Sequence, residues 1–156
     1  MSETVQVVSF KLGAEEYGVD IDQVQEINRM VAVTHVPRAP QFMEGVINLR
    51  GQLIPIIDLR TRFGMPRAEH TKNTRIVVTE IGTKRVGMVV DSVSEVLRVP
   101  AAQIEDAPEM LTGVDTEYIH GVGKVEDRLI ILLDLARIIS TSERRELESS
   151  EVESAA

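Results

Sequence analysis

The hydrophobic positions of this chain fall in short β-branched runs separated by glycine-containing turns, a pattern typical of β-hairpins. Two hairpins are expected, from residues 5–12 with 17–19 and residues 75–81 with 85–90. Two more strand pairs, turning at Arg50-Gly51 and Glu126-Asp127, are expected at residues 44–49 with 53–57 and 118–125 with 129–133. Many short strands punctuated by glycine and proline predict an all-β fold built as small barrels or a sandwich.

The strand pattern occurs twice along the chain. Residues 5–30 overlay residues 74–99 at an offset of 69, and residues 45–59 overlay residues 121–135 at an offset of 76. The matched positions include glycine, aspartate, glutamate and arginine as well as apolar residues. Chance similarity between β-rich segments is the alternative, but two long ungapped blocks in the same order favour a duplicated structural unit.

The duplication predicts two five-stranded barrels that share a seam, with short helices at the barrel ends and a C-terminal helix. The first barrel is expected at residues 1–68 and the second at 69–140, and exchange of strands across the seam is left open. Residues 141–156, rich in serine and glutamate, are expected to be a disordered tail.

Local signals add two details to each unit. Asp58 and Asp134 stand where an N-cap would begin a short helix. Ile21, Val24 and Ile27 are spaced by three residues, as are their counterparts in the second unit, and this spacing predicts a helical turn with one apolar stripe.

Composition and charge limit the classes of partner that the protein is expected to bind. The 25 acidic against 17 basic side chains give a net charge of -8, which repels nucleic-acid phosphates and anionic lipid. The two tyrosines and three phenylalanines, with no tryptophan, leave few platforms for stacking bases. The apolar runs are too short to span a bilayer and the N-terminus lacks signal-peptide features, so a cytoplasmic protein without direct membrane insertion is expected.

The sequence shows no assembled catalytic or metal-binding motif. Cysteine is absent, and His35, His70 and His120 are not spaced to share a metal. The glycine-lysine stretches at 82–84 and 121–124 lack the full phosphate-loop pattern and fit hairpin turns better. We therefore expect no catalytic residue, no cofactor and no metal site, and a protein that is not an enzyme.

The two copies differ most clearly at one turn. Residues 48–51 read Asn-Leu-Arg-Gly, whereas their counterparts at 124–127 read Lys-Val-Glu-Asp. Arginine is enriched at protein interfaces, and a glycine lets a partner backbone come close. Arg50 is therefore either part of a docking corner or pairs with Glu26 or Asp58 to hold the turn, and spacing alone does not separate the two interpretations.

Several stretches of this chain resemble the CheW family of bacterial chemotaxis coupling proteins. The resemblance covers about residues 5–140 and is carried by residues 10–27, 42–59, 86–96 and 129–135. It implies two SH3-like barrels of five strands each, with an apolar groove between them. It also implies a non-catalytic adaptor between the cytoplasmic tips of methyl-accepting chemotaxis receptors and the regulatory domain of the histidine kinase CheA.

The same resemblance implies a set of receptor-contacting positions. They are Val24, Glu26, Gly45, Asn48, Arg50 and Val86. A receptor helix is expected to place apolar side chains near Val24 and Val86, with Arg50 and Glu26 fixing its orientation. Two alternatives remain, namely a small enzyme with its site in the seam and a structural repeat protein that associates with itself.

Overall fold

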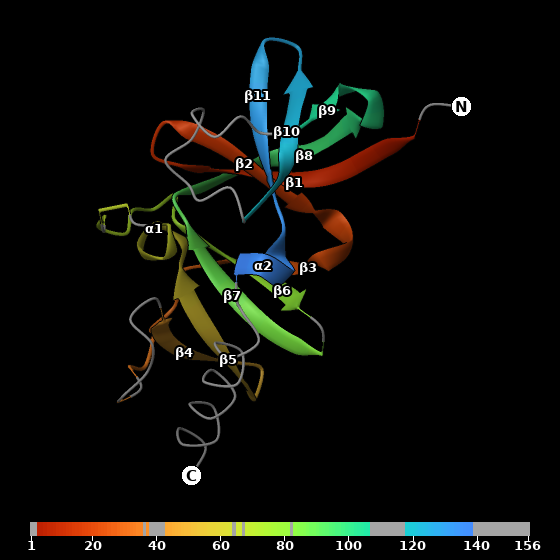
Figure 1. Ribbon diagram of the computed structural model, residues 1–156. Helices are drawn as coiled ribbons and strands as arrows, with labels where there is room; N and C mark the ends of the chain where they lie inside the picture. The colour runs from red at the N-terminus through yellow and green to blue at the C-terminus, as the bar shows by residue number, and fades with distance from the viewer. Residues whose placement is uncertain are drawn as a thin grey trace.

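The computed structural model describes residues 3–35, 37, 43–63, 65–66, 68–81, 83–106 and 118–138. Their strands form two sheets, in two lobes (Figure 1). The five-strand lobe holds, in spatial order, β3 (Val24–Arg29), β6 (Arg75–Ile81), β7 (Lys84–Val90), β5 (Gln52–Asp58) and β4 (Met43–Leu49). The six-strand lobe holds β8 (Ser92–Pro100), β1 (Thr4–Leu12), β2 (Glu15–Asp20), β11 (Arg128–Leu133), β10 (Ile119–Val125) and β9 (Ile104–Glu105). The all-β prediction is confirmed, and the sixth strand is the two-residue edge strand β9.

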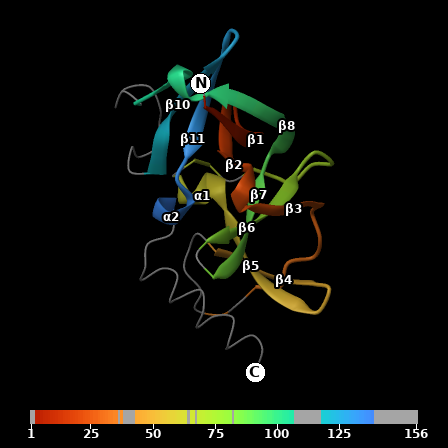
Figure 2. The same cartoon turned by 90° about the vertical axis from the view of Figure 1, so that its right-hand side faces the viewer.

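Short helices lie at the ends of strands. They are the 3-10 turns η1 (Ile21–Gln23) and η2 (Ala101–Gln103) and the helices α1 (Leu59–Arg62) and α2 (Leu135–Ile138). Both views place α1 and α2 between the two lobes (Figures 1 and 2). Asp58 Oδ1 accepts a hydrogen bond from Arg60 N at 3.0 Å, and Asp134 Oδ1 accepts one from Ala136 N at 3.1 Å. The predicted caps are thus confirmed.

The pairing of the strands confirms the internal repeat. Val8 pairs with Val19 in the β1–β2 hairpin, and the residues 69 positions later, Val77 and Met88, pair in the β6–β7 hairpin. The parallel pairs repeat too, since β11 meets β2 at Leu132–Gly18 and β5 meets β7 at Ile56–Gly87. The two turns share a left-handed residue, with φ of 52° at Arg50 and 56° at Glu126.

The lobes do not coincide with the predicted units 1–68 and 69–140. The β1–β2 hairpin of the first unit lies in the six-strand lobe, and the β6–β7 hairpin of the second unit lies in the five-strand lobe. The two repeats have therefore exchanged hairpins, and residue 68 separates repeats rather than lobes. The tail at 141–156 lies outside the described residues.

The expected helical stripes are wrong beyond the single turn η1. Val24 and Ile27 lie in β3, and their counterparts Val93 and Val96 lie in β8. Each strand carries a register shift at the same repeat position, around Gln25 in β3 and opposite Ser9 and Phe10 in β8. A bulge sets two residues against one, so it breaks the two-residue alternation and imitates a helical spacing.

Buried side chains form three clusters. One lies within the five-strand lobe and contains Ile47, Ile54, Ile56, Ile76, Val78 and Val89. Its counterpart within the six-strand lobe contains Val7, Val99, Ile130 and Leu132. The third and largest draws on both lobes and fills the seam between them with apolar side chains. Each lobe thus has an inner core, and the two lobes share a third.

An aromatic row passes through this shared core. Phe10, Tyr17, Phe63 and Tyr118 follow one another with ring centroids 6.0, 5.9 and 5.8 Å apart. Burial raises the pKa of Tyr17, so its hydroxyl stays neutral. Phe63 follows α1 of the five-strand lobe, while the other three rings belong to the six-strand lobe, so the row joins the lobes.

Candidate partner-binding site

Glu26, Asn48 and Arg50 meet at an exposed corner of the five-strand lobe. Glu26 lies on β3, while Asn48 and Arg50 lie at the β4–β5 turn. Since β3 and β4 are the two edges of the sheet, curvature of the sheet must bring those edges together here. Arg50 Nη2 donates to Glu26 Oε1 at 2.5 Å, which joins the two edges. We call the group formed by Glu26, Asn48, Arg50, Gln52 and Arg85 the Arg50 corner.

The backbone of the turn holds Arg50 in place. Arg50 and Gly51 both have positive φ, 52° and 85°, as in the tight turns that close two-residue hairpins. Asn48 Oδ1 accepts a hydrogen bond from Gly51 N at 2.9 Å and so fixes the turn from the side. The Arg50 side chain remains 69% exposed, so most of its five N–H donors face solvent.

The two arginines of the Arg50 corner favour the ionised form of Glu26. The hydrogen bond from Arg50 lowers the pKa of Glu26, and the positive charge of Arg85 lowers it further. Arg85 also donates to the side-chain oxygen of Gln52. Glu26 is therefore ionised at neutral pH, and the corner carries one net positive charge.

The other three predicted positions are less exposed than the corner. Val24, at the start of β3, is partly buried against the shared core. Gly45 is buried in β4, where an added Cβ would lie 2.3 Å from the carbonyl oxygen of Thr34. Val86 is 1% exposed and belongs to the shared core, so its side chain supports the surface from inside.

One interpretation of Arg50, that it pairs with Glu26 to hold the turn, describes the structure, and the docking corner stays a prediction. The ion pair with Glu26 is present, whereas Asp58 instead caps α1. The pair occupies one edge of a guanidinium that is otherwise exposed. Glu26 therefore orients Arg50 and leaves most of its donors exposed to solvent.

The six-strand lobe has a matching corner with the charges rearranged. Arg128 Nη1 donates to Glu95 at 2.9 Å, and Arg128 Nε donates to Glu16 at 3.2 Å. These three residues are the repeat counterparts of Gln52, Glu26 and Arg85 respectively. Over the five equivalent positions this second corner carries one net negative charge, so the shared fold does not determine the charge.

The alignment of the two repeats contained a signal for Arg85 and Gln52, two corner residues that were not predicted from the sequence. Arg85 stands opposite Glu16 in the repeat, and Gln52 stands opposite Arg128. Both are differences inside well-matched blocks, like the one at Arg50. The site could have been extended to Arg85 and Gln52 by the same comparison.

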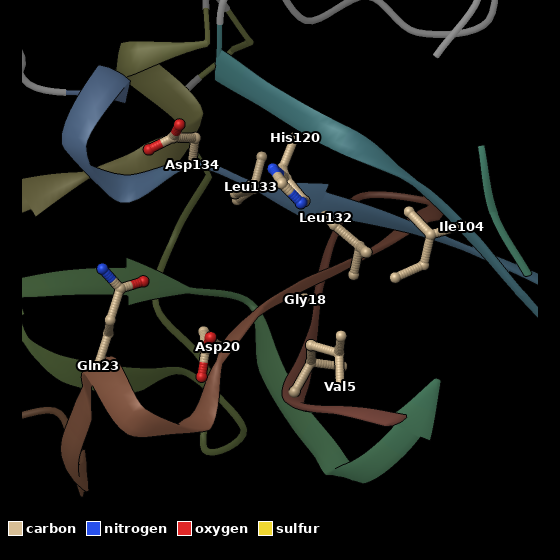
Figure 3. Close-up of a pocket in the computed structure, with 10 residues that line it drawn as sticks. Val5, Gly18, Asp20, Gln23, Ile104, His120, Leu132, Leu133 and Asp134 are labelled. Atoms are coloured by element: carbon tan, nitrogen blue, oxygen red, sulfur yellow. The ribbon is translucent and has the colours of Figure 1, made fainter. Parts of the chain in front are cut away.

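A cavity of about 280 Å³ opens in the six-strand lobe (Figure 3). In this view Asp134, Gln23 and Asp20 lie on the left, Val5 and Ile104 lie on the right, and His120 lies between the two groups. Asp20 accepts from Asp22 N at 2.9 Å and Asp134 caps α2, so both carboxylates have structural partners. Within the described residues, no group of three or more His, Cys, Asp or Glu side chains could hold a metal ion.

These observations define a class of protein. The fold presents charged surface corners on two lobes, and the two carboxylates that line the cavity cap helical turns, an arrangement that suits a protein-binding adaptor. The chain belongs to the CheW-like family, because the model of the CheW-like domain matches residues 6–143. Within the described residues, no helix is long and apolar enough to cross a membrane.

Similar proteins agree with this assignment. The chain is 45% identical to the chemotaxis protein CheW of Klebsiella aerogenes, over 86% of this chain and 81% of the relative. It is 34% identical to the chemotaxis protein CheW of Bacillus subtilis, over 85% of each. The crystal structure of the scaffolding protein TtCheW from Thermoanaerobacter tengcongensis matches with a TM-score of 0.82 and 38% identity, covering 90% and 91% of the two chains. The chain is a non-enzymatic chemotaxis adaptor.

Proposed function

We propose that this adaptor works in the cytoplasm and couples the cytoplasmic tips of methyl-accepting chemotaxis receptors to the regulatory domain of the histidine kinase CheA. The observation that carries the proposal is the Arg50 corner, where an exposed guanidinium is held by Glu26. Membership of a chemotaxis adaptor family supports the signalling context. The two oppositely charged corners, one on each lobe, support a protein that meets two partners at once.

The receptor surface proposed here combines charge with apolar contact. Ile27 of β3 is 41% exposed and Leu53 of β5 is 36% exposed. Apolar surface is therefore available on the two strands that carry Glu26 and Gln52. A receptor helix would place apolar side chains against β3 near Val24, while Arg50 binds an acidic or carbonyl group at its rim. Burial of the Arg50–Glu26 pair by the partner would strengthen its hydrogen bonds.

The first prediction concerns Arg50. Arg50→Asp removes the free donors and sets a negative charge beside Glu26, so binding to a receptor tip fragment should be lost. Binding to the CheA regulatory domain, measured separately, should change less, because we propose that this domain binds away from the Arg50 corner. Calorimetric titration with each purified fragment measures both effects.

Two matched variants complete the experiment. Glu26→Arg combined with Arg50→Glu restores an ion pair of reversed direction, so it should keep the turn and still fail to bind the receptor. Arg137→Ala removes an arginine from an exposed ion pair on α2, and binding should be unchanged. Full receptor binding by the reversed pair would show that Arg50 only holds the turn, and unchanged binding by folded Arg50→Asp would remove Arg50 from the site.

A further inference from the structure

The chain passes between the lobes at two points related by the repeat. It leaves the six-strand lobe through η1, which contains Asp22, and returns to it through Asp91, between β7 and β8. Asp22 and Asp91 are 69 positions apart and so are equivalent in the repeat. The surroundings of these two aspartates differ, and the difference involves α1.

Asp91 is bound from both lobes. Arg60 Nε donates to its Oδ1 at 2.8 Å and Arg60 Nη2 donates to its Oδ2 at 2.6 Å, so α1 of the five-strand lobe holds it with two hydrogen bonds. Gly13 N, in the β1–β2 turn of the six-strand lobe, donates to Oδ2 at 2.8 Å. Asp91 N in turn donates to Lys11 O at 3.0 Å. Two parallel bonds from a planar guanidinium fix direction as well as distance.

A second arginine of α1 also reaches the six-strand lobe. Arg62 Nε donates to Ile138 O, at the end of α2, at 2.7 Å, and its guanidinium carbon lies 5.1 Å from the Tyr118 ring centre. Figure 2 shows α1 and α2 lying together between the lobes. The one-turn helix α1 thus connects to the other lobe at two separate places.

The equivalent helix of the second repeat lacks both arginines. Ala136 and Ile138 of α2 occupy the positions of Arg60 and Arg62. Asp22 is exposed, and among the described residues no hydrogen bond or ion pair engages its carboxylate. The fold therefore forms without such a contact at one of its two crossings, so the repeat topology does not require the contact at Asp91.

We propose that Arg60, through Asp91, is a positioning residue that fixes the angle between the two lobes. The shared apolar core brings the lobes together but is non-directional, so it leaves their relative rotation less defined than directed bonds do. This inference rests on the proposed function in one respect, because an adaptor that couples two partners must hold its two surfaces in a fixed relation. Arg60 belongs to neither charged corner and would act through the angle alone.

The test measures the angle directly, with no partner present. Because the chain contains no cysteine, single cysteines at the exposed Thr83 and Asp127 place one spin label on each lobe. Double electron–electron resonance on the full chain should give a narrow distance distribution for the parent and a shifted or broadened one for Arg60→Ala. Arg60→Lys, which keeps the charge without the two parallel bonds, should fall between them, and Arg137→Ala should match the parent.

The outcomes separate positioning from simple stabilisation. A folded Arg60→Ala with a lower melting temperature but the parent's distance distribution would overturn the proposal. If Arg60→Ala does not fold, Arg60→Lys and Asp91→Asn, which preserve size, are measured instead, and an unchanged distribution in both would overturn it equally.

A second measurement relates the angle to signalling. Arg60→Lys should bind receptor and CheA fragments separately as the parent does, but receptor-dependent control of the kinase should be reduced in the assembled complex. Normal control by a variant with a broadened distribution would overturn the coupling role. A parent that binds neither fragment would instead contradict the proposed function, and the spin-label result would stand by itself.

Discussion

At the residue scale, Asp91 is a group whose protonation should weaken the folded state. Its hydrogen bonds with Arg60 lower its pKa below the ordinary value of 3.8, and the bond from Gly13 adds to this effect. A depressed pKa means that the unfolded chain binds the proton more readily. The stabilisation is therefore complete above pH 3.8 and is lost as the pH falls through the folded-state pKa.

Asp91→Asn should accordingly destabilise the protein at neutral pH, and the difference from the parent should shrink below pH 3.8. Urea unfolding followed by circular dichroism measures the free energy of unfolding under both conditions. Asp22→Asn is the matched control, because it makes the same change at the other crossing without an arginine partner, and it should have little effect at either pH. A difference for Asp91→Asn that stays constant across this range would contradict the assignment of the ion pair as its cause.

Arg50 and Glu126 show that the backbone conformation of a residue and the contacts of its side chain can have separate causes. Both adopt the same left-handed conformation, because the same tight turn joins equivalent strands. Their side chains have opposite charge and different surroundings. The turn could be predicted from sequence for that reason. The partner of Arg50 was left open between Glu26 and Asp58, because the contact with Glu26, 24 residues away in sequence, depends on the curvature of the sheet.

At the element scale, the parallel contact in each lobe depends on a glycine. An added Cβ at Gly87 would lie 2.5 Å from Ile56 Cδ1 and 2.8 Å from Ile76 Cγ2, so Gly87→Ala forces two buried side chains to move. At the equivalent Gly18 the nearest atoms are 3.1, 3.2 and 3.3 Å away. The two substitutions thus add the same methyl group at two equivalent sites, one of which is packed more closely than the other.

Gly87→Ala should lower the free energy of unfolding by about 1–3 kcal/mol, the usual cost of overpacking a core. Gly18→Ala should change it by less than about 1 kcal/mol, because a small adjustment relieves its contacts while alanine restricts the unfolded chain. Chemical denaturation of both variants measures the difference. Equal losses would show that these distances do not control the cost.

The sequence predicted the strands, turns and caps better than it predicted which strands pair with one another. Offsets of 69 and 76 carried hairpins, caps and turns from one repeat to the other. The exchange of hairpins was not predictable, because β1–β2 and β6–β7 have the same register and apolar pattern, so either could pair with either unit. The bulges at Gln25 and in β8 were missed because they depend on the partner strand.

At the scale of the whole molecule, exchanged hairpins and a shared core make the lobes interdependent. The five-strand lobe is continuous from β3 to β7, whereas the six-strand lobe is closed by strands from both ends of the described chain. Neither inner cluster is as large as the one in the seam. Opening the seam would expose that largest apolar surface to water, at a cost roughly proportional to its area.

The molecule should therefore unfold in one cooperative transition, with equal calorimetric and van't Hoff enthalpies. Phe63 is 7% exposed and lies in the seam between two other rings. Phe63→Ala should therefore lower the free energy of unfolding by about 3–5 kcal/mol. It should also raise the ratio of the calorimetric to the van't Hoff enthalpy above one, because the lobes begin to unfold separately. Ile54→Ala, inside the five-strand lobe, should cost about 2–5 kcal/mol and leave the ratio unchanged. Two resolved transitions in the parent would show that the seam does not join the lobes thermodynamically, and a signal could then cross the adaptor only through its chain crossings and the contacts of α1.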